Sequence, residues 1–211
     1  MPEDKIVSHA KVGIIGGGIM GVSLLYHLAK EGWKDLVLLE KGELTSGSTW
    51  HAAGQCPQMM GSYNLAKVHL ESTNLYKKLE KETEQPTGFH DCGSLRLAYK
   101  KEDLDWFKYV KGILDNVGAP AEIISTNEIK NVHPFIKLDG IFGAFHTPED
   151  GHTDPTSTTN AMAKGARNHG AKIYRKNRVT DIKLLSSGEW KVITEKGDII
   201  CEHVVNAAGS Y

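Results

Sequence analysis

The chain has 211 residues, enough for one good-sized domain or for one domain and part of another. Hydrophobic residues make up 40% of the sequence and 22 glycines accompany them, a composition typical of globular rather than disordered or fibrous proteins. The 25 basic and 26 acidic residues leave a formal net charge of -1. This balance indicates a mixed, solvated surface and argues against nucleic acid or an anionic membrane as the partner.

The cysteines and the start of the chain bear on where the protein works. No apolar run approaches the roughly 20 residues of a membrane span, so none is expected. Residues 1–10 lack a signal peptide's apolar stretch and are too short for an arginine-rich transit peptide. Cys56, Cys92 and Cys201 stand far apart and form neither a CxxC pair nor a metal-binding spacing, which suits a reducing compartment. We expect a cytoplasmic protein without a metal site, or a mitochondrial matrix protein if the source is eukaryotic and the start has been trimmed.

Apolar periodicity predicts alternating strands and helices along the chain, with glycine and proline marking their ends. From the start of the chain we expect a strand at 11–15, a helix at 19–30, a strand at 36–39, an irregular segment at 41–60 and a helix at 63–82. A strand at 93–99, a helix at 103–117, a strand at 122–124 and a helical turn should follow, the turn being capped by Ser125 or Thr126 with Glu128 close by. The rest should comprise a strand at 141–146, a helix that is capped by Asp154 and runs to about 169, and strands at 172–174, 179–184, 190–194, 199–201 and 204–206. The last strand runs into Ala207-Ala208-Gly209, where a helix would normally follow. The sequence is therefore expected to be cut off in mid-fold.

A glycine-rich turn lies between the first strand and the first helix. The run Gly16-Gly17-Gly18-Ile19-Met20-Gly21 fits GxGxxG in the strand–turn–helix context that gives this pattern its meaning. Gly16 permits the tight turn, Gly18 lets the backbone approach a pyrophosphate, and Gly21 lets the helix pack against the sheet. The helix N-terminus would present free N–H groups and a partial positive charge to the phosphates.

Glu40 ends the second strand, about 20 residues after the motif. A carboxylate at this place can accept hydrogen bonds from both hydroxyls of an adenosine ribose, and it would repel the 2′-phosphate of NADP. The turn and the acid together predict a dinucleotide site. At this point NAD and FAD fit equally well.

The irregular segment after Glu40 decides between the two dinucleotides. Its stretch Ser48-Thr49-Trp50-His51-Ala52-Ala53-Gly54 is similar to the flavin-attachment segment of the dimethylglycine and sarcosine dehydrogenase family, within the larger group of D-amino-acid-oxidase-like flavoproteins. In that family the histidine is bonded to the 8α-methyl carbon of FAD, so the resemblance implies covalent FAD through His51. A neutral imidazole is a competent nucleophile for such a bond. Trp50 either packs against the flavin or anchors the loop in the core.

The resemblance covers 12–211, including the stretches at 88–90, 93–97 and 150–155. In this group of flavoproteins the backbone near Val179 meets the adenine, and the Ala-Ala-Gly turn passes close to the FAD phosphates. The loop hydroxyls suit the pyrophosphate and the ribityl chain. The residues predicted to bind the cofactor are Gly16, Gly18, Ile19, Met20, Gly21, Glu40, Lys41, Thr45, Ser46, Ser48, Thr49, His51, Gly54, Val179, Ala208 and Gly209.

The fold class that follows is α/β. A Rossmann-like FAD-binding domain is expected from 5–86 and 147–211, with the start of a mixed-sheet substrate domain inserted at 87–146. The family's catalytic base, much of its substrate pocket and its folate-binding region are expected beyond the end of this chain. No residue is therefore assigned as catalytic, and tetrahydrofolate is a further cofactor only through that region. Four side chains could face a substrate: His90, Arg96, His146 and His152. Arg96 would be a natural partner for the substrate's carboxylate. A structural role is nevertheless favoured for each of the four.

The implied reaction oxidises the C–N bond of a small N-methylated amino acid, of the dimethylglycine or sarcosine type, by hydride transfer to flavin N5. The product is an iminium that hydrolyses to an amine and an aldehyde. The electron acceptor stays open between oxygen, a flavoprotein and a quinone. One alternative is another flavoenzyme of the group, such as a D-amino-acid or glycerol-3-phosphate dehydrogenase, against which Trp50-His51 argues. A second is a non-catalytic regulatory relative, which would be expected to lack His51.

Overall fold

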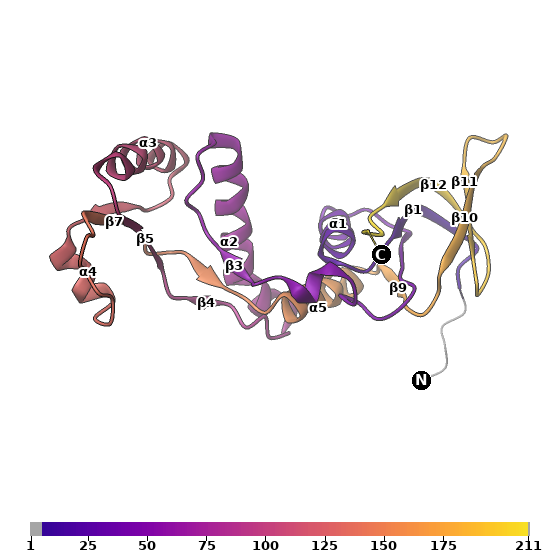
Figure 1. Ribbon diagram of the computed structural model, residues 1–211. Helices are drawn as coiled ribbons and strands as arrows, with labels where there is room; N and C mark the ends of the chain where they lie inside the picture. Colours follow the sequence, from indigo (N-terminus) through magenta and orange to yellow (C-terminus); the bar gives the residue numbers. More distant parts are fainter. Residues whose placement is uncertain (1–5, 211) are drawn as a thin grey trace. The chain divides into compact units, whose positions relative to one another are not determined.

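The computed structural model describes residues 6–210 and divides into two compact units (Figure 1). The first unit comprises the described residues of Met1–Ala53, Leu79–Thr87 and Asp154–Tyr211, and the second comprises Gly54–Lys78 and Gly88–Thr153. Compared with the predicted division, the second unit also includes 54–78 and 147–153. The predicted domain ends at Lys5 and Tyr211 lie outside the described residues.

The first unit is built on a six-stranded sheet in the order β10-β11-β12-β1-β2-β9. Strands β12, β1, β2 and β9 run parallel, and β10 and β11 add an antiparallel hairpin at one edge. Helices α1 and α5 pack against each other beside the parallel strands (Figure 1). The elements are β1 (His9–Ile15), α1 (Ile19–Lys30), β2 (Leu36–Leu39), the 3-10 turn η1 (Ser48–His51), α5 (Pro155–Asn168), β9 (Lys172–Tyr174), β10 (Val179–Leu184), β11 (Trp190–Thr194) and β12 (Ile199–Asn206).

The central strands are apolar because both faces of the sheet are covered. All four residues of β2 are buried, as expected for a parallel strand between two layers. On one side α1 buries Val22, Leu25, Tyr26 and Ala29, which recur at helical spacing. On the other side a cluster of buried residues closes the core between the parallel strands and the hairpin: Ala10, Val37, Leu39, Val192, Ile199 and Cys201.

The last strand corrects the sequence prediction. The expected strands at 199–201 and 204–206 are one continuous strand, β12, which pairs with β1 from His9↔Ile200 to Ile15↔Asn206. The exposed polar residues Glu202 and His203 interrupt the apolar pattern. They do not interrupt the ladder, because strand pairing is made by backbone groups.

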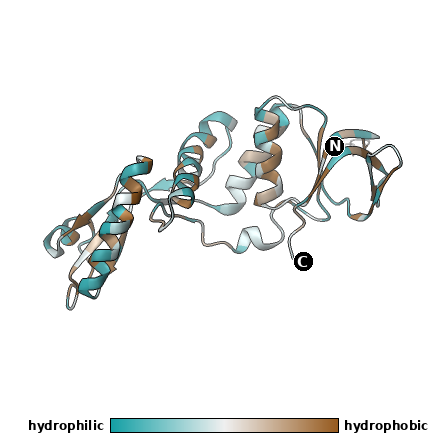
Figure 2. Ribbon diagram, turned by 90° about the horizontal axis from the view of Figure 1, so that it is seen from above, coloured by the Kyte–Doolittle hydropathy of each residue, from teal (hydrophilic) through white to brown (hydrophobic). Residues whose placement is uncertain are grey.

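The second unit contains two three-stranded sheets, in the orders β3-β8-β4 and β5-β7-β6. Hydrophobic and hydrophilic residues alternate along its helices (Figure 2). One core cluster joins the second sheet to α2 and α3 through Ala66, Phe107, Val110 and Phe145. The elements are β3 (Gln55–Cys56), α2 (Tyr63–Thr83, whose last residues belong to the first unit), β4 (His90–Asp91), β5 (Ser94–Ala98), α3 (Lys101–Val117), β6 (Glu122–Ile124), α4 (Thr126–Val132), β7 (Gly143–Thr147) and β8 (Gly151–His152).

Two of the predicted helix caps are confirmed. Ser125 Oγ accepts a hydrogen bond from Glu128 N, and Ser125 N donates a 2.7 Å hydrogen bond to Glu128 Oε2, which together form a capping box. Asp154 accepts a 2.6 Å hydrogen bond from the backbone N–H of Ser157 at the start of α5. The pKa of the Asp154 carboxyl is lowered by these hydrogen bonds from Ser157.

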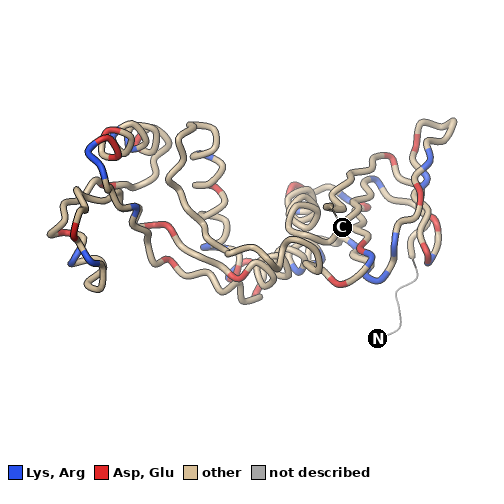
Figure 3. The backbone as a smooth tube through the Cα atoms, in the orientation of Figure 1, with Lys and Arg blue, Asp and Glu red and all other residues tan. Residues whose placement is uncertain are grey.

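Basic and acidic residues are interspersed along the described backbone, in keeping with the nearly balanced charge (Figure 3). Within residues 6–210, no helix is both long and apolar enough to cross a membrane.

Candidate functional site

The carboxyl ends of three parallel strands meet at one edge of the six-stranded sheet. Ile15 at the end of β1 pairs with Leu39 of β2 on one side and with Asn206 of β12 on the other. The glycine turn, Glu40 and the Ala-Ala-Gly turn directly follow these three residues. In open α/β sheets, ligands bind at this edge, where neighbouring connections diverge to either side of a strand.

The glycine turn is held tightly against this edge. Gly16 has a φ of 115°, and a Cβ there would lie 2.2 Å from the carbonyl oxygen of Ala207. A Cβ at Gly21 would lie 2.1 Å from the carbonyl oxygen of Gly16. The first intrahelical hydrogen bond of α1 runs from Val22 N to Gly18 O at 3.0 Å. The N–H groups of Met20 and Gly21 therefore lie in the first turn of the helix, where backbone N–H groups without an intrahelical partner commonly bind anions.

Glu40 lies under the glycine turn as a buried carboxylate. Its Oε2 accepts a 2.6 Å hydrogen bond from Gly17 N, and its Oε1 accepts a 2.7 Å hydrogen bond from Gly42 N. Each carboxylate oxygen still has acceptor capacity, because a carboxylate offers about four lone-pair sites. The acid therefore organises the turn and can also accept hydrogen bonds from ribose hydroxyls.

The start of β10 runs beside Glu40. Asn177 N donates to Glu40 O at 2.9 Å, and Lys176 N donates to Gly42 O at 3.1 Å. Val179, the first residue of β10, follows two positions later. These two bonds bring Val179 to the Glu40 side of the sheet, although β10 is an edge strand. Sequence reasoning missed Asn177, since nothing in the local pattern marks a contact so far along the chain.

An ion cluster holds the same two segments together. Glu43 forms ion pairs with Arg175 and with Lys176. Hydrogen bonding to Lys176, with a further contribution from the charge of Arg175, lowers the pKa of the Glu43 carboxyl. The exposed Lys41 lies between this cluster and Glu40 in the chain.

Two threonines link the loop at 45–49 to the glycine turn. Thr45 is buried with a φ of 69°, and its N–H donates to Gly17 O at 2.9 Å. Thr49 is buried as well, and its Oγ1 accepts a 3.0 Å hydrogen bond from Ile19 N. Its hydroxyl, predicted with the other loop hydroxyls to serve the pyrophosphate and the ribityl chain, thus acts as a cap for α1. Ser46 and Ser48 are exposed.

Trp50 and His51 form an exposed aromatic pair on the 3-10 turn η1. Their ring centroids are 3.8 Å apart and the planes are inclined by 33°. Trp50 is 57% exposed, so it does not anchor the loop in the core. The exposed His51 imidazole is accessible to a ligand in solution.

The remaining predicted residues lie at two different places. Ala208 and Gly209 are exposed just beyond β12, where Ala208 N donates to Asn206 Oδ1 at 3.1 Å. Gly54 is the first residue of the second unit, and its carbonyl oxygen accepts a 2.8 Å hydrogen bond from Thr153 N. All other predicted cofactor residues belong to the first unit.

Taken together, these residues fit a dinucleotide. The helix N-terminus offers donors for a pyrophosphate, and the buried carboxylate of Glu40 offers acceptors for a ribose. Among the described residues, a Cβ at Gly18 would have a single neighbour within 4 Å, Thr49 Oγ1 at 3.1 Å. That open side leaves the backbone free for close approach by phosphate.

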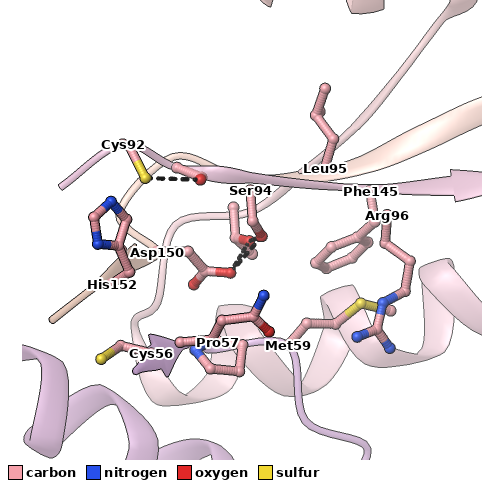
Figure 4. Close-up of a pocket in the computed structure, with 14 residues that line it drawn as sticks. Cys56, Pro57, Met59, Cys92, Ser94, Leu95, Arg96, Phe145, Asp150 and His152 are labelled. Carbon is pink, nitrogen blue, oxygen red and sulfur yellow. Dashed lines mark hydrogen bonds between the residues drawn. The ribbon is translucent and has the colours of Figure 1, made fainter. Parts of the chain in front are cut away.

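The second unit holds a separate cavity of about 320 Å³ (Figure 4). Of the four side chains considered for substrate contact, Arg96 and His152 line it, whereas His90 and His146 do not. His90 instead faces His152 across β4 and β8, with ring centroids 5.1 Å apart. The buried Asp150 also lines the cavity, and sequence reasoning assigned it no role.

Comparisons with known proteins show what this chain is similar to. Dimethylglycine dehydrogenase, mitochondrial, of Rattus norvegicus is 46% identical over 208 residues, which cover 99% of this chain and 24% of that protein. The mitochondrial pyruvate dehydrogenase phosphatase regulatory subunit of Mus musculus is 38% identical over 204 residues, which cover 97% of this chain and 23% of that protein. The crystal structure of L-proline dehydrogenase from P. horikoshii matches with a TM-score of 0.86 at 31% identity, covering 96% of this chain and 53% of that one.

The chain spans about a quarter of the length of these two curated relatives. The similarity to dimethylglycine dehydrogenase confirms the predicted resemblance, and the match to L-proline dehydrogenase confirms the predicted α/β fold. The family model described as FAD dependent oxidoreductase matches residues 11–211. The chain therefore belongs to the family of FAD-dependent oxidoreductases.

Proposed function

We propose that the protein oxidises the C–N bond of a small N-methylated amino acid, of the dimethylglycine or sarcosine type, using FAD attached covalently to His51. The observation that carries this proposal is the exposed His51 imidazole. It lies on the same loop as Thr49, which caps helix α1 directly after the glycine turn. A dimethylglycine dehydrogenase that is 46% identical supports the substrate class.

The chain's own residues would hold the cofactor at the sheet edge. Bound FAD supplies the chemistry by accepting a hydride. The N–H groups of Met20 and Gly21 would face its pyrophosphate, and Glu40 would accept hydrogen bonds from its ribose. The backbone at Val179 would lie against the adenine, and the turn at Ala208 would lie near the phosphates. We also propose that His51 holds the flavin through a covalent bond, which prevents its loss.

The surroundings of the reaction are proposed from the same resemblance. The relative's name describes a mitochondrial protein, which favours that location over the cytoplasm. Tetrahydrofolate is proposed as a further cofactor, and the electron acceptor is oxygen, a flavoprotein or a quinone.

A regulatory, non-catalytic role is the second candidate, because a phosphatase regulatory subunit is 38% identical. Such a role would not require a flavin tether. His51 is present in this chain and favours the enzyme.

The test compares the wild-type protein with His51→Ala, and with His9→Ala as a control at another exposed histidine of the first unit. After a denaturing gel, wild type and His9→Ala should show a fluorescent flavin band, and His51→Ala should not. Dimethylglycine oxidation is followed with an artificial electron acceptor. Yellow protein without a fluorescent band would contradict the covalent bond. A folded wild-type protein without any flavin would contradict the enzyme and support the regulatory role.

A further inference from the structure

The cavity of the second unit contains a cation and an anion in one small space (Figure 4). Its volume is about 320 Å³, which lies at the lower end of the range for small-molecule sites. Arg96 and Asp150 both line it. Two charges of opposite sign in a cavity of this size suit a small ligand that itself carries both charges.

Arg96 is a cation without a partner among the residues that the structure describes. Among residues 6–210, the structure gives its guanidinium no hydrogen bond and no ion pair. Strand alternation places Arg96 on the same face of β5 as Ser94, and its backbone pairs with Phe145. A guanidinium presents five N–H donors in a planar fork that matches a carboxylate. Arg96 is therefore available for an anionic group on the ligand.

Asp150 is an anion fixed in one orientation. It is only 2% exposed. Its Oδ2 accepts hydrogen bonds from the hydroxyls of Ser94, at 2.6 Å, and of Thr147. Its Oδ1 accepts a 2.7 Å hydrogen bond from Gln58 N. Three donors hold the carboxylate rigidly, as Figure 4 shows for Ser94.

The negative charge of Asp150 influences a neighbouring thiol in the cavity wall. Cys56 lines the same cavity, and burial together with the negative charge of Asp150 raises the pKa of its thiol to about 11. Met59 and Phe145 form an apolar part of the wall and are themselves buried. Such a wall suits the methyl and methylene groups of an N-methylated amino acid.

We propose that this cavity binds a small zwitterionic amino acid, with its carboxylate on Arg96 and its ammonium group toward Asp150. The identification of the ligand as the N-methylated substrate rests on the proposed function. Binding of a zwitterion as such rests only on the cavity.

Arg96 is tested with Arg96→Met, Arg96→Lys and a control, Lys108→Met, at an exposed residue of α3 whose ion pair is with Asp105. The probes are N,N-dimethylglycine and N,N-dimethylaminoethanol, which lacks the carboxylate. In calorimetric titration, Arg96→Met should weaken dimethylglycine binding roughly 10- to 100-fold, the loss of one charge-assisted interaction. Binding of dimethylaminoethanol should not change, and Arg96→Lys should restore part of the affinity. Equal dimethylglycine affinity in Arg96→Met and wild type would overturn the assignment.

Asp150 is tested with Asp150→Asn, using dimethylglycine and methoxyacetate, which has a carboxylate but no ammonium group. Only dimethylglycine should bind more weakly. Asp150→Asn with wild-type affinity for dimethylglycine, or with an equal loss of affinity for the two probes, would overturn the role of Asp150.

In turnover, Arg96→Met should raise KM by the same 10- to 100-fold factor as its loss of dimethylglycine affinity, and it should leave kcat within about threefold of wild type. Flavin-bearing protein that oxidises dimethylglycine with an unchanged KM in Arg96→Met would overturn the cavity proposal alone. If the isolated wild-type protein carries no flavin and still binds dimethylglycine in an Arg96-dependent way, the proposed function is overturned and the cavity proposal stands.

Discussion

The backbone N–H of Gly17 donates a 2.6 Å hydrogen bond to Oε2 of Glu40. Glu40, which is expected to bind the ribose, is thus also hydrogen-bonded to the glycine turn. Helix α1 and strand β2 separate the two in the sequence. Because Oε1 of the same carboxylate accepts from Gly42 N, one side chain connects the ends of β1 and β2. The predicted cofactor binding and the local stability would therefore depend on the same carboxylate.

Glu40→Gln should lose both stability and FAD affinity. The amide keeps one acceptor but turns its NH₂ group toward a backbone donor, which leaves a buried N–H unpaired. We expect the free energy of unfolding to fall by about 1–3 kcal/mol in urea titration of the flavin-free protein. The control, Glu31→Gln at the exposed end of α1, should stay within about 0.5 kcal/mol of wild type. If the two variants unfold alike, the carboxylate does not hold the turn.

Alanine substitutions at two glycines of the motif should separate folding from cofactor binding. At Gly18 a Cβ meets only Thr49 Oγ1 at 3.1 Å, and the φ of -77° is ordinary. Gly18→Ala should fold with a free energy of unfolding within about 1 kcal/mol of wild type but lose FAD, because the methyl group occupies the phosphate side.

Gly21→Ala should fail in a different way, since its Cβ would lie 2.1 Å from Gly16 O. We expect it to be destabilised by about 1–3 kcal/mol or more. Gly112→Ala, in open space on α3, is the control and should be neutral or slightly stabilising. The measurements are the flavin absorbance per protein and the urea midpoint. Gly18→Ala protein with full flavin content would show that this glycine does not face the phosphates.

The sequence predicts the strand–helix–strand unit well, because its signals are local. The elements at 19–30 and 36–39 agree residue for residue with α1 and β2, since apolar spacing and flanking glycines define them. The two-residue strands β3, β4 and β8 carry no such pattern and were not predicted. They form a sheet only because three distant segments are brought together.

Parts of both sites depend on contacts that no local pattern encodes. Asn177 N donates to Glu40 O although the second unit and α5 lie between the two residues in the sequence. Asp150 is fixed by Gln58 N, a residue 92 positions away. The exposure of Trp50 likewise follows from the tertiary position of η1, because an aromatic residue in an irregular segment suits the core and the surface equally. Sequence motifs therefore indicate the predicted cofactor loop more readily than the side chains that support it.

Thr49→Val should weaken the start of α1. The valine keeps the shape of the side chain but cannot accept the hydrogen bond from Ile19 N. Loss of a helix cap costs about 0.5–2 kcal/mol, so the urea midpoint should fall. Thr49→Ser retains the hydroxyl and should recover most of the stability. A serine variant as unstable as the valine variant would mean that packing of the Thr49 methyl group, rather than the cap, is responsible.

Alkaline pH should destabilise the protein through its two buried thiols. Burial raises the pKa of Cys56 and of Cys201 from 9.0 to about 11, with the charge of Asp150 adding to the effect at Cys56. Between these values the unfolded chain has released the thiol protons while the folded chain still holds them. The free energy of unfolding must therefore fall as pH rises from 9 to about 11, and below pH 9 the thiols contribute no pH dependence.

The measurement is the urea midpoint at several pH values across this window, for wild type and for Cys56→Ala combined with Cys201→Ala. The double variant should be less stable at neutral pH, because two core side chains are shortened, but it should lose less stability on going to alkaline pH. Tyr26 and Tyr76, whose pKa values are also raised by burial, will maintain part of the fall. Cys92→Ala, at the exposed cysteine, is the matched control and should follow the wild-type curve. A double variant with the full wild-type fall would show that the buried thiols do not titrate in this range, and that the tyrosines and other groups carry the alkaline instability.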